Sequence, residues 1–267
     1  MLTNILRQAT EAGAVELERY FNRIDLKTSI KTGGVNDLVT EADHASDKAI
    51  IGIIKTAFPD HFILSEEAGN ITTDSEYKWI IDPIDGTINF ANGIPICCVS
   101  IGLEKAGTMI AGAVYNPFMK EFYYAEKGMG AYLNDQPICV STKTALINAC
   151  LVTGFPYTYL DSPNGPLQCF ERFIRKGVPV RRLGSAAIDL CWVAAGRFDG
   201  FYEHKLNAWD SAAGFLMVEE AGGKVTDFKN EYYSPYQPHI IATNGHIHDE
   251  LVMVVNDEHD GYRLTGN

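Results

Sequence analysis

Residues 79–87 read Trp-Ile-Ile-Asp-Pro-Ile-Asp-Gly-Thr. The apolar beginning of this run predicts a buried strand, and its end predicts a tight loop that carries two carboxylates. Pro83 restricts the backbone of the loop, and Gly86 lets a ligand approach the backbone closely. The last two residues also suit the start of a short helix, whose free N–H groups bind a phosphate. The run therefore predicts a strand that delivers Asp82 and Asp85 to a site.

The loop after this strand offers the ligands that a magnesium ion prefers. Mg²⁺ takes hard oxygen ligands in near-octahedral geometry at ~2.1 Å. Asp82, Asp85 and the backbone carbonyl of Ile84 supply such oxygens from one short loop. An Asp-Pro and Asp-Gly turn after a buried strand is also common without any function. The loop therefore indicates a metal site only in combination with further carboxylates.

Three further acids stand at the ends of expected elements. Glu66 follows the strand 61–65, Asp210 lies at the start of an apolar helix, and Asp43 lies in the first turn of another helix. Each has an ordinary structural explanation, because acids are common in turns and near helix N-termini. Thr40 and Asp43 resemble a capping box. Taken singly, these acids indicate helix caps and a solvated turn.

The hydrophobic patterns predict a mixed α+β half, residues 1–144, and an α/β half, residues 145–267. Strands that alternate with helices in the second half indicate an α/β layer. No Pro/Ser-rich linker separates the halves, so we expect them to share one packed interface. The expected helices are 2–22, 41–57, 166–176, 185–196, 208–221 and 246–255, and the expected strands are 61–65, 79–82, 96–104, 109–115, 121–125, 149–153, 198–202, 223–227 and 239–243.

The composition is that of a soluble globular protein, with 46% hydrophobic and 21% charged residues among 267. The formal net charge is −12, whereas nucleic-acid binding leaves a basic footprint. A negative chain also repels a phosphate, and a bound divalent cation reverses the sign locally. We therefore expect no nucleic-acid partner, and a cation wherever a phosphate binds.

The cysteines and the N-terminal segment bear on the compartment. The six cysteines show no C-x-x-C spacing and do not cluster with histidines, so reduced thiols are the simplest interpretation. The N-terminal segment lacks the apolar stretch of a signal peptide, and no run reaches the ~18 apolar residues of a transmembrane helix. We therefore expect a cytoplasmic protein without membrane contact.

Several segments match one family in order and spacing. They are Lys31, 36–43, 65–67, 79–90 and 209–214. The runs W-x-x-D-P-x-D-G-T-x-N-F and W-D-x-A-A-G are highly specific, and the segments span nearly the whole chain. The sequence therefore resembles the inositol monophosphatase family, a Mg²⁺-dependent, lithium-sensitive type of phosphatase. The resemblance implies the layered αβαβα sandwich of the sugar phosphatases, which include fructose-1,6-bisphosphatase, with the site between the two halves. It also implies a homodimer.

The resemblance carries specific roles to this sequence. The residues that it implies for two to three Mg²⁺ ions are Glu66, Asp82, Asp85, Asp210 and the Ile84 carbonyl. It implies that Gly86 and Thr87 bind the phosphate, and that Asp43 and Thr87 orient the attacking water with Glu66 nearby. It further implies that Ala186, Glu203 and Asp210 contact the polyol, and it places Lys31 near the anionic site.

The implied reaction is hydrolysis of inositol monophosphate to inositol and phosphate by an activated water. The segment from His204 to Ala208 departs from the animal enzymes, and fructose 1,6-bisphosphate, NADP and 3′-phosphoadenosine 5′-phosphate stay open as substrates. A haloacid-dehalogenase-type phosphatase also has an Asp-rich loop that ends in D-G-T, but one residue separates its two acids, and here two do. A protein-binding role on the same scaffold is the non-enzymatic alternative.

Overall fold

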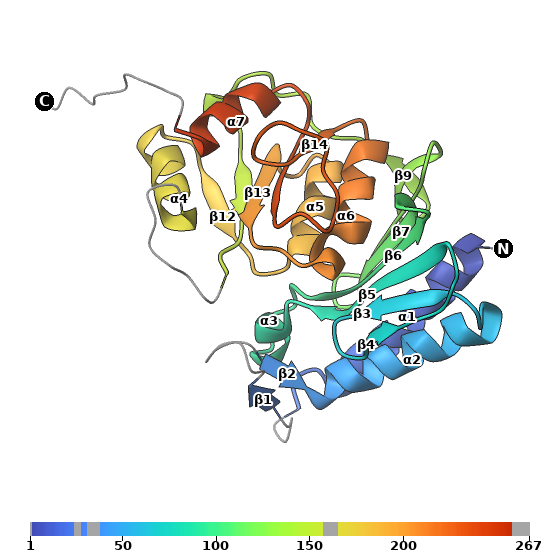
Figure 1. Cartoon of the computed structure of the whole chain (residues 1–267). Coiled ribbons are helices and arrows are strands. Elements are labelled where there is room, and N and C mark those ends of the chain that lie inside the picture. The colour runs from blue at the N-terminus through green and yellow to red at the C-terminus, as the bar shows by residue number, and fades with distance from the viewer. Residues whose placement is uncertain (1, 24–27, 31–37, 157–164, 258–267) are drawn as a thin grey trace, which may run out of the picture.

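Two sheets alternate with three layers of helices in the part of the chain that the computed structural model describes, which is residues 2–23, 28–30, 38–156 and 165–257 (Figure 1). The outer helices are α1 (Leu2–Tyr20) and α2 (Glu41–Ala57) on one side and α4 (Pro166–Arg175) and α7 (His248–Val255) on the other. Helices α5 (Ala186–Ala194) and α6 (Ala208–Glu220) lie between the sheets. The expected αβαβα sandwich is confirmed.

The large sheet has eight strands in the order β10-β9-β8-β7-β6-β5-β3-β4. The strands are β3 (Phe62–Ser65), β4 (Gly69–Ile71), β5 (Tyr77–Asp85), β6 (Cys98–Lys105), β7 (Thr108–Asn116), β8 (Glu121–Glu126), β9 (Gly130–Leu133) and β10 (Gln136–Ile138). Strands β3 and β5 are parallel, and Ser65 pairs with Ile81. This register brings Glu66, which follows β3, beside Asp82 in β5.

The small sheet has five strands in the order β12-β11-β13-β15-β14. The strands are β11 (Leu151–Thr153), β12 (Val180–Arg182), β13 (Gly200–His204), β14 (Lys224–Thr226) and β15 (His239–Thr243). Because β12, β11 and β13 are parallel, their carboxyl ends meet at one edge of the sheet. Open α/β sheets bind their ligands at such an edge.

Both faces of the large sheet are buried, which explains the apolar run at its centre. Trp79 and Ile81 pack toward α1 and α2, whereas Ile80 packs into the core shared with α5 and α6. Successive side chains of a strand point to opposite faces. A strand covered by helices on both faces therefore needs apolar residues at every position.

Helix α6 approaches the large sheet closely because both surfaces carry small residues. A Cβ atom at Gly112 of β7 would lie 2.9 Å from the Cα atom of Ala213, and one at Gly102 of β6 would lie 2.9 Å from the Cβ atom of Ala212. The run W-D-x-A-A-G thus has a packing role. It seats α6 against the sheet and thereby fixes the position of Asp210 in its first turn.

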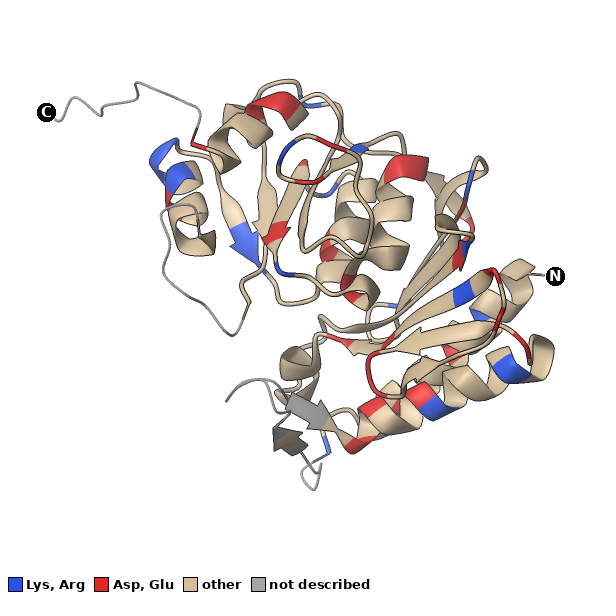
Figure 2. Ribbon diagram, viewed as in Figure 1, with Lys and Arg blue, Asp and Glu red and all other residues tan. Residues whose placement is uncertain are grey.

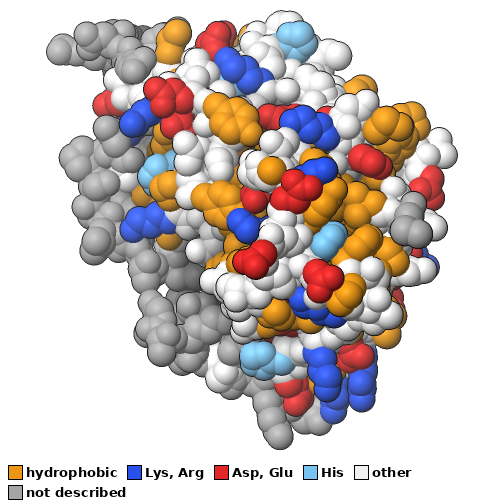
Figure 3. Space-filling view, turned by 45° about the vertical axis from the view of Figure 1, so that its right-hand side comes forward, with side chains coloured by type: hydrophobic (Ala, Val, Ile, Leu, Met, Phe, Trp, Pro, Cys, Tyr) orange, Lys and Arg blue, Asp and Glu red, His pale blue; other side chains and the backbone are white. Residues whose placement is uncertain are grey.

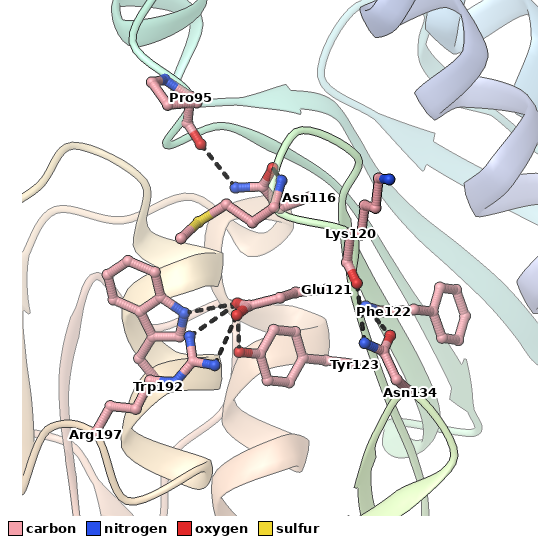
Figure 4. A network of polar contacts seen from close by, with 10 residues as sticks. Pro95, Asn116, Lys120, Glu121, Phe122, Tyr123, Asn134, Trp192 and Arg197 are labelled. Carbon is pink, nitrogen blue, oxygen red and sulfur yellow. Dashed lines mark hydrogen bonds and ion pairs between the residues drawn. The ribbon is translucent and has the colours of Figure 1, made fainter.

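A polar network joins the large sheet to α5, the other helix of the middle layer (Figure 4). Glu121 of β8 accepts hydrogen bonds from Arg197, from the indole N–H of Trp192 at 3.2 Å and from the hydroxyl of Tyr123 at 2.8 Å. Burial raises the pKa of Glu121, but these hydrogen bonds outweigh it and lower the pKa below its usual value. The carboxylate therefore ties the strand to the C-terminal end of α5.

The expected longer elements are present, with bounds that shift by a few residues. The helix expected at 246–255 begins at His248, and the strand expected at 96–104 begins at Cys98. The short pieces were missed: β4, β9, β10, β12, the pair β1 (Thr28–Ile30) and β2 (Leu38–Thr40), and the 3₁₀ turn Leu146–Asn148. The boundary between residues 144 and 145 stays a prediction. Within the described ranges, every helix is too short or too polar to cross a bilayer.

Candidate active site

A cavity of about 330 Å³ lies where the end of β5 meets the carboxyl ends of β11, β12 and β13. Figure 2 shows acidic segments at this junction: the ends of α5, α6 and β5 are red, and the red end of β13 lies beside the blue end of β12. Most of the predicted site residues line this cavity: Glu66, Asp82, Ile84, Asp85, Gly86, Thr87, Ala186, Glu203 and Asp210. The fold thus brings together residues that are up to 144 positions apart, from 66 to 210.

The end of β5 is shaped by a bulge between Asp82 and Asp85. Pro83 cannot donate a hydrogen bond to the neighbouring strand, so it fits an irregular position of this kind. Its carbonyl accepts a hydrogen bond from Ser46 of α2 at 2.9 Å, and the Ile84 N–H donates to Asp82 Oδ1 at 3.1 Å. These contacts hold the Asp82 carboxylate at the wall of the cavity.

Asp85 is held by the N-terminus of α5. Its Oδ2 atom accepts hydrogen bonds from Ser185 Oγ at 2.6 Å and from the Ala187 N–H at 2.7 Å. Ser185 is also the N-cap of α5, and its Oγ atom accepts from the Ile188 N–H. The Oδ2 atom of Asp85 thus ties the end of β5 to the start of α5.

Asp43 has the capping position that its sequence predicted, and it contacts Thr87 of the cavity without lining the cavity itself. Its Oδ2 atom accepts hydrogen bonds from the backbone and side chain of Thr40 at 2.8 and 2.7 Å, which completes the capping box of α2. Its Oδ1 atom lies 3.3 Å from Thr87 Oγ1, which also lies 3.1 Å from the Ile84 carbonyl oxygen. Burial raises the pKa of Asp43 to about 6.

Asp210 likewise combines a cap with a place in the cavity. Its Oδ2 atom accepts a hydrogen bond from the N–H of Asn207, the N-cap of α6, at 2.7 Å. Burial, and then the charge of Asp85, raises the pKa of Asp210 well above its usual value. The ordinary explanation of Asp210 as a capping residue is therefore correct, and it does not exclude a role in the site.

The acids of the cavity repel one another. Burial raises the pKa of Asp82 well above its usual value, and the charges of Glu66, Asp85 and Asp210 raise it further. Burial also raises the pKa of Asp85 to about 6, although its hydrogen bonds act in the opposite direction. A bound cation would reduce the repulsion between these carboxylates.

The donor set fits a hard divalent cation, because carboxylate and carbonyl oxygens are the ligands that Mg²⁺ prefers. The fit concerns chemistry and location. Over the described ranges, no three His, Cys, Asp or Glu side chains are already drawn together closely enough to enclose an ion. The acids instead line the wall of one cavity.

The turn after β5 requires glycine at position 86. Gly86 has φ 89°, and a Cβ atom there would lie 2.9 Å from the Ile96 carbonyl oxygen and 3.1 Å from that of Gly184. The short helix α3 (Thr87–Ala91) begins directly after it, as the sequence predicted. The Asn89 amide donates to the carbonyls of Ile96 and Leu183, both at 2.8 Å. The turn is thus anchored to both sheets.

The small sheet contributes Glu203 to the cavity. Glu203 lies near the end of β13 and is 9% exposed. A side chain at Gly154, which follows β11, would overlap the Glu203 carboxylate. Glycine at this position therefore leaves the space that the carboxylate occupies.

Several residues that line the cavity were not predicted for the site, among them Gly154, Arg182, Asp189 and Lys205. Gly154, Arg182 and Lys205 lie at or after the ends of the parallel strands β11, β12 and β13, and a correct prediction of β12 would have indicated Arg182. Asp189 lies in the first turn of α5, where the sequence pattern reads only as a helix start. The prediction for Lys31 concerns a position outside the described residues.

Comparisons with known proteins agree with this architecture. The model of the inositol monophosphatase family matches residues 1–260. The inositol-1-monophosphatase of Synechocystis sp. is 47% identical over 222 residues, which are 82% of this chain and 77% of the relative. The Nus factor SuhB of Pasteurella multocida is 41% identical over 253 residues, which are 94% of each chain. The solved structure of the extragenic suppressor protein suhB from Bartonella henselae has a TM-score of 0.89 and 39% identity, and covers 95% of this chain and 98% of that one.

An αβαβα sandwich with an oxygen-lined acidic cavity between its sheets defines a sugar-phosphatase architecture. The matches also cover most of the chain at high sequence identity, so they establish the family as well as the fold. The chain belongs to the inositol monophosphatase family.

Proposed function

We propose that the protein is a Mg²⁺-dependent phosphomonoester hydrolase that converts inositol 1-phosphate and water to inositol and phosphate. The observation that carries the proposal is the convergence of Glu66, Asp82, Asp85 and Asp210 on one cavity with a glycine turn beside them. The family membership and the name of the Synechocystis relative support the activity.

The ligands that we propose for two to three Mg²⁺ ions are Glu66, Asp82, Asp85, Asp210 and the carbonyl of Ile84. When bound, Mg²⁺ supplies positive charge that activates water and stabilises the phosphoryl and leaving oxygens. Donor chemistry supports this assignment, since the cavity wall offers buried carboxylates whose mutual repulsion a cation relieves.

The remaining residues take roles in binding and orientation. The N–H groups of Gly86 and Thr87 bind the phosphate at the start of α3. Asp43 accepts a hydrogen bond from the Thr87 hydroxyl, whose oxygen orients the attacking water, with Glu66 nearby. The 3.3 Å separation of Asp43 Oδ1 from Thr87 Oγ1 supports this pair. Ala186, Glu203 and Asp210 contact the polyol.

The proposed partner is a small phosphate ester bound by a cytoplasmic homodimer. On the face in Figure 3, basic side chains are interspersed with acidic ones and form no continuous basic surface. The net charge of −12 also disfavours a polyanion as partner.

The test is phosphate release from a panel of esters with and without Mg²⁺. The panel contains inositol 1-phosphate, fructose 1,6-bisphosphate, NADP and 3′-phosphoadenosine 5′-phosphate. We expect the highest kcat/KM for inositol 1-phosphate and no turnover in a chelator. A higher value for another ester would reassign the substrate. A folded protein that hydrolyses none of them would support a binding role on this scaffold instead.

A further inference from the structure

A buried carboxylate, Asp189, lines the cavity without a role in the proposed reaction. It lies in the first turn of α5 and is 1% exposed. Its Oδ1 atom has no hydrogen-bond partner among the residues that the structure describes. Asp189 therefore lies in the wall of the cavity with one buried carboxylate oxygen unsatisfied.

The ordinary explanation for an acid at this place is the helix dipole. Acids in the first turn of a helix are stabilised by the partial positive charge of its N-terminus. That effect is available to an exposed side chain, as Asp249 in the first turn of α7 illustrates. It does not account for burial, because a buried acceptor without a partner destabilises the folded state. A ligand group that donates a hydrogen bond would remove this cost.

The charges around Asp189 indicate which kind of ligand group fits beside it. Burial raises the pKa of Asp189 well above its usual value, the Glu203 charge raises it further, and the Arg182 charge acts in the opposite direction. Glu203 and Arg182 line the same cavity, at or near the ends of the parallel strands β13 and β12. Two carboxylates near one guanidinium disfavour an anionic substituent at this place. They favour neutral hydroxyl groups, which donate to one neighbour and accept from another.

We propose that Asp189 is a specificity-determining residue that binds a ring hydroxyl of a cyclic polyol phosphate, together with Glu203. The inference rests on the proposed phosphatase function and adds a second carboxylate to the residues that select its polyol. The two carboxylates come from different elements, α5 and β13, so they contact different hydroxyl groups of one ring. A ring without hydroxyls leaves both acids unsatisfied.

The experiment compares two substrates that share a six-membered ring. Inositol 1-phosphate carries ring hydroxyls, and cyclohexyl phosphate carries none. We expect Asp189→Ala to lower kcat/KM for inositol 1-phosphate roughly 10- to 100-fold, the range for a hydrogen bond to a charged group. The loss on cyclohexyl phosphate should be much smaller. The change should lie mainly in KM, since the contact is made in both the ground state and the transition state.

Two further variants separate binding from structure. Asp189→Asn keeps the shape and an acceptor, so it should recover part of the activity on inositol 1-phosphate. Asp249→Ala removes an exposed acid from the first turn of another helix, α7, and should leave the preference between the substrates unchanged. Equal losses on both substrates in the Asp189 variants, or no loss on either, would overturn the inference. A wild-type protein that is inert toward both esters with Mg²⁺ would overturn the proposed phosphatase function, and the inference with it.

Discussion

The Ser185 hydroxyl donates a hydrogen bond to Asp85 Oδ2 at 2.6 Å, across a separation of 100 residues. The same hydroxyl oxygen caps α5, so one side chain couples the start of a helix to a carboxylate of the cavity. Groups that hold a ligand in place in this way tune the affinity of the site.

Ser185→Ala should therefore weaken Mg²⁺ binding and also destabilise the fold. We expect the Mg²⁺ concentration for half-maximal activity to rise roughly 10- to 100-fold, and the free energy of unfolding to fall by about 1 kcal/mol through the lost cap. Ser185→Thr keeps a capping hydroxyl and serves as the control. An unchanged Mg²⁺ titration in Ser185→Ala would contradict the coupling.

Burial and the charges of neighbouring carboxylates raise the pKa of Asp82, and removal of this acid tests the metal assignment. We expect Asp82→Asn to lower kcat by at least ~10³-fold, which is the scale of a lost electrostatic contributor. Thermal unfolding without Mg²⁺ should stay at or above the wild-type temperature, because one source of repulsion is gone. Turnover close to the wild-type value would rule out this ligand set.

The proposed direct attack of water has a stereochemical signature. Hydrolysis of a chiral phosphate ester in ¹⁸O-labelled water should proceed with inversion at phosphorus, since one in-line displacement takes place. Retention would imply two displacements through a covalent intermediate. It would favour an aspartyl nucleophile of the haloacid-dehalogenase type.

Glu203 should bind the polyol and not the phosphate. Glu203→Ala should lower kcat/KM for inositol 1-phosphate roughly 10- to 100-fold, because a hydrogen bond to a charged group contributes ~1.5–3 kcal/mol. The kcat/KM for p-nitrophenyl phosphate, which has no polyol hydroxyls, should fall much less. Equal losses on both esters would point to a metal or folding role for this carboxylate.

His248 makes the stability of the protein depend on pH. It is fully buried between Thr226 and Thr243, with both ring nitrogens 2.9 Å from a threonine hydroxyl. The Thr226 hydroxyl donates to the Asp227 carbonyl, so its oxygen accepts a hydrogen bond from the ring. Burial lowers the pKa of His248 from 6.5 to about 4.

Between these two pKa values the unfolded chain binds a proton that the folded chain does not, so acidification destabilises the fold. The titration of His248 should lower the free energy of unfolding by about 3 kcal/mol as the pH falls from 6.5 to 4. The raised pKa values of Asp43 and Asp85 make acidification stabilise the fold. The contribution of His248 is therefore measured as the difference between the wild type and a variant that lacks this histidine. The free energy of unfolding of the wild type relative to His248→Gln should fall as the pH falls. A pH-independent difference would show that the ring titrates normally.

The sequence by itself determined the longer helices and strands, because local patterns report them directly, and the family resemblance predicted the layered fold. The apolar run before Asp82 predicted a strand buried on both faces, and Trp79, Ile80 and Ile81 are fully buried. The capping pattern of Thr40 and Asp43 predicted the start of α2, and the capping box is present. These features depend on neighbours in the chain, so no distant contact is needed to read them.

Tertiary structure alone decided which residues share the cavity and how they interact. The short strand β12 depends on its pairing with β11, so the place of Arg182 in the cavity could not be read from a local pattern. The bond between Ser185 and Asp85 joins elements that meet only when α5 packs between the sheets. Asp189 was missed for the same reason: a first-turn acid reads as a helix start, and only the packing of α5 shows that it is buried beside the cavity.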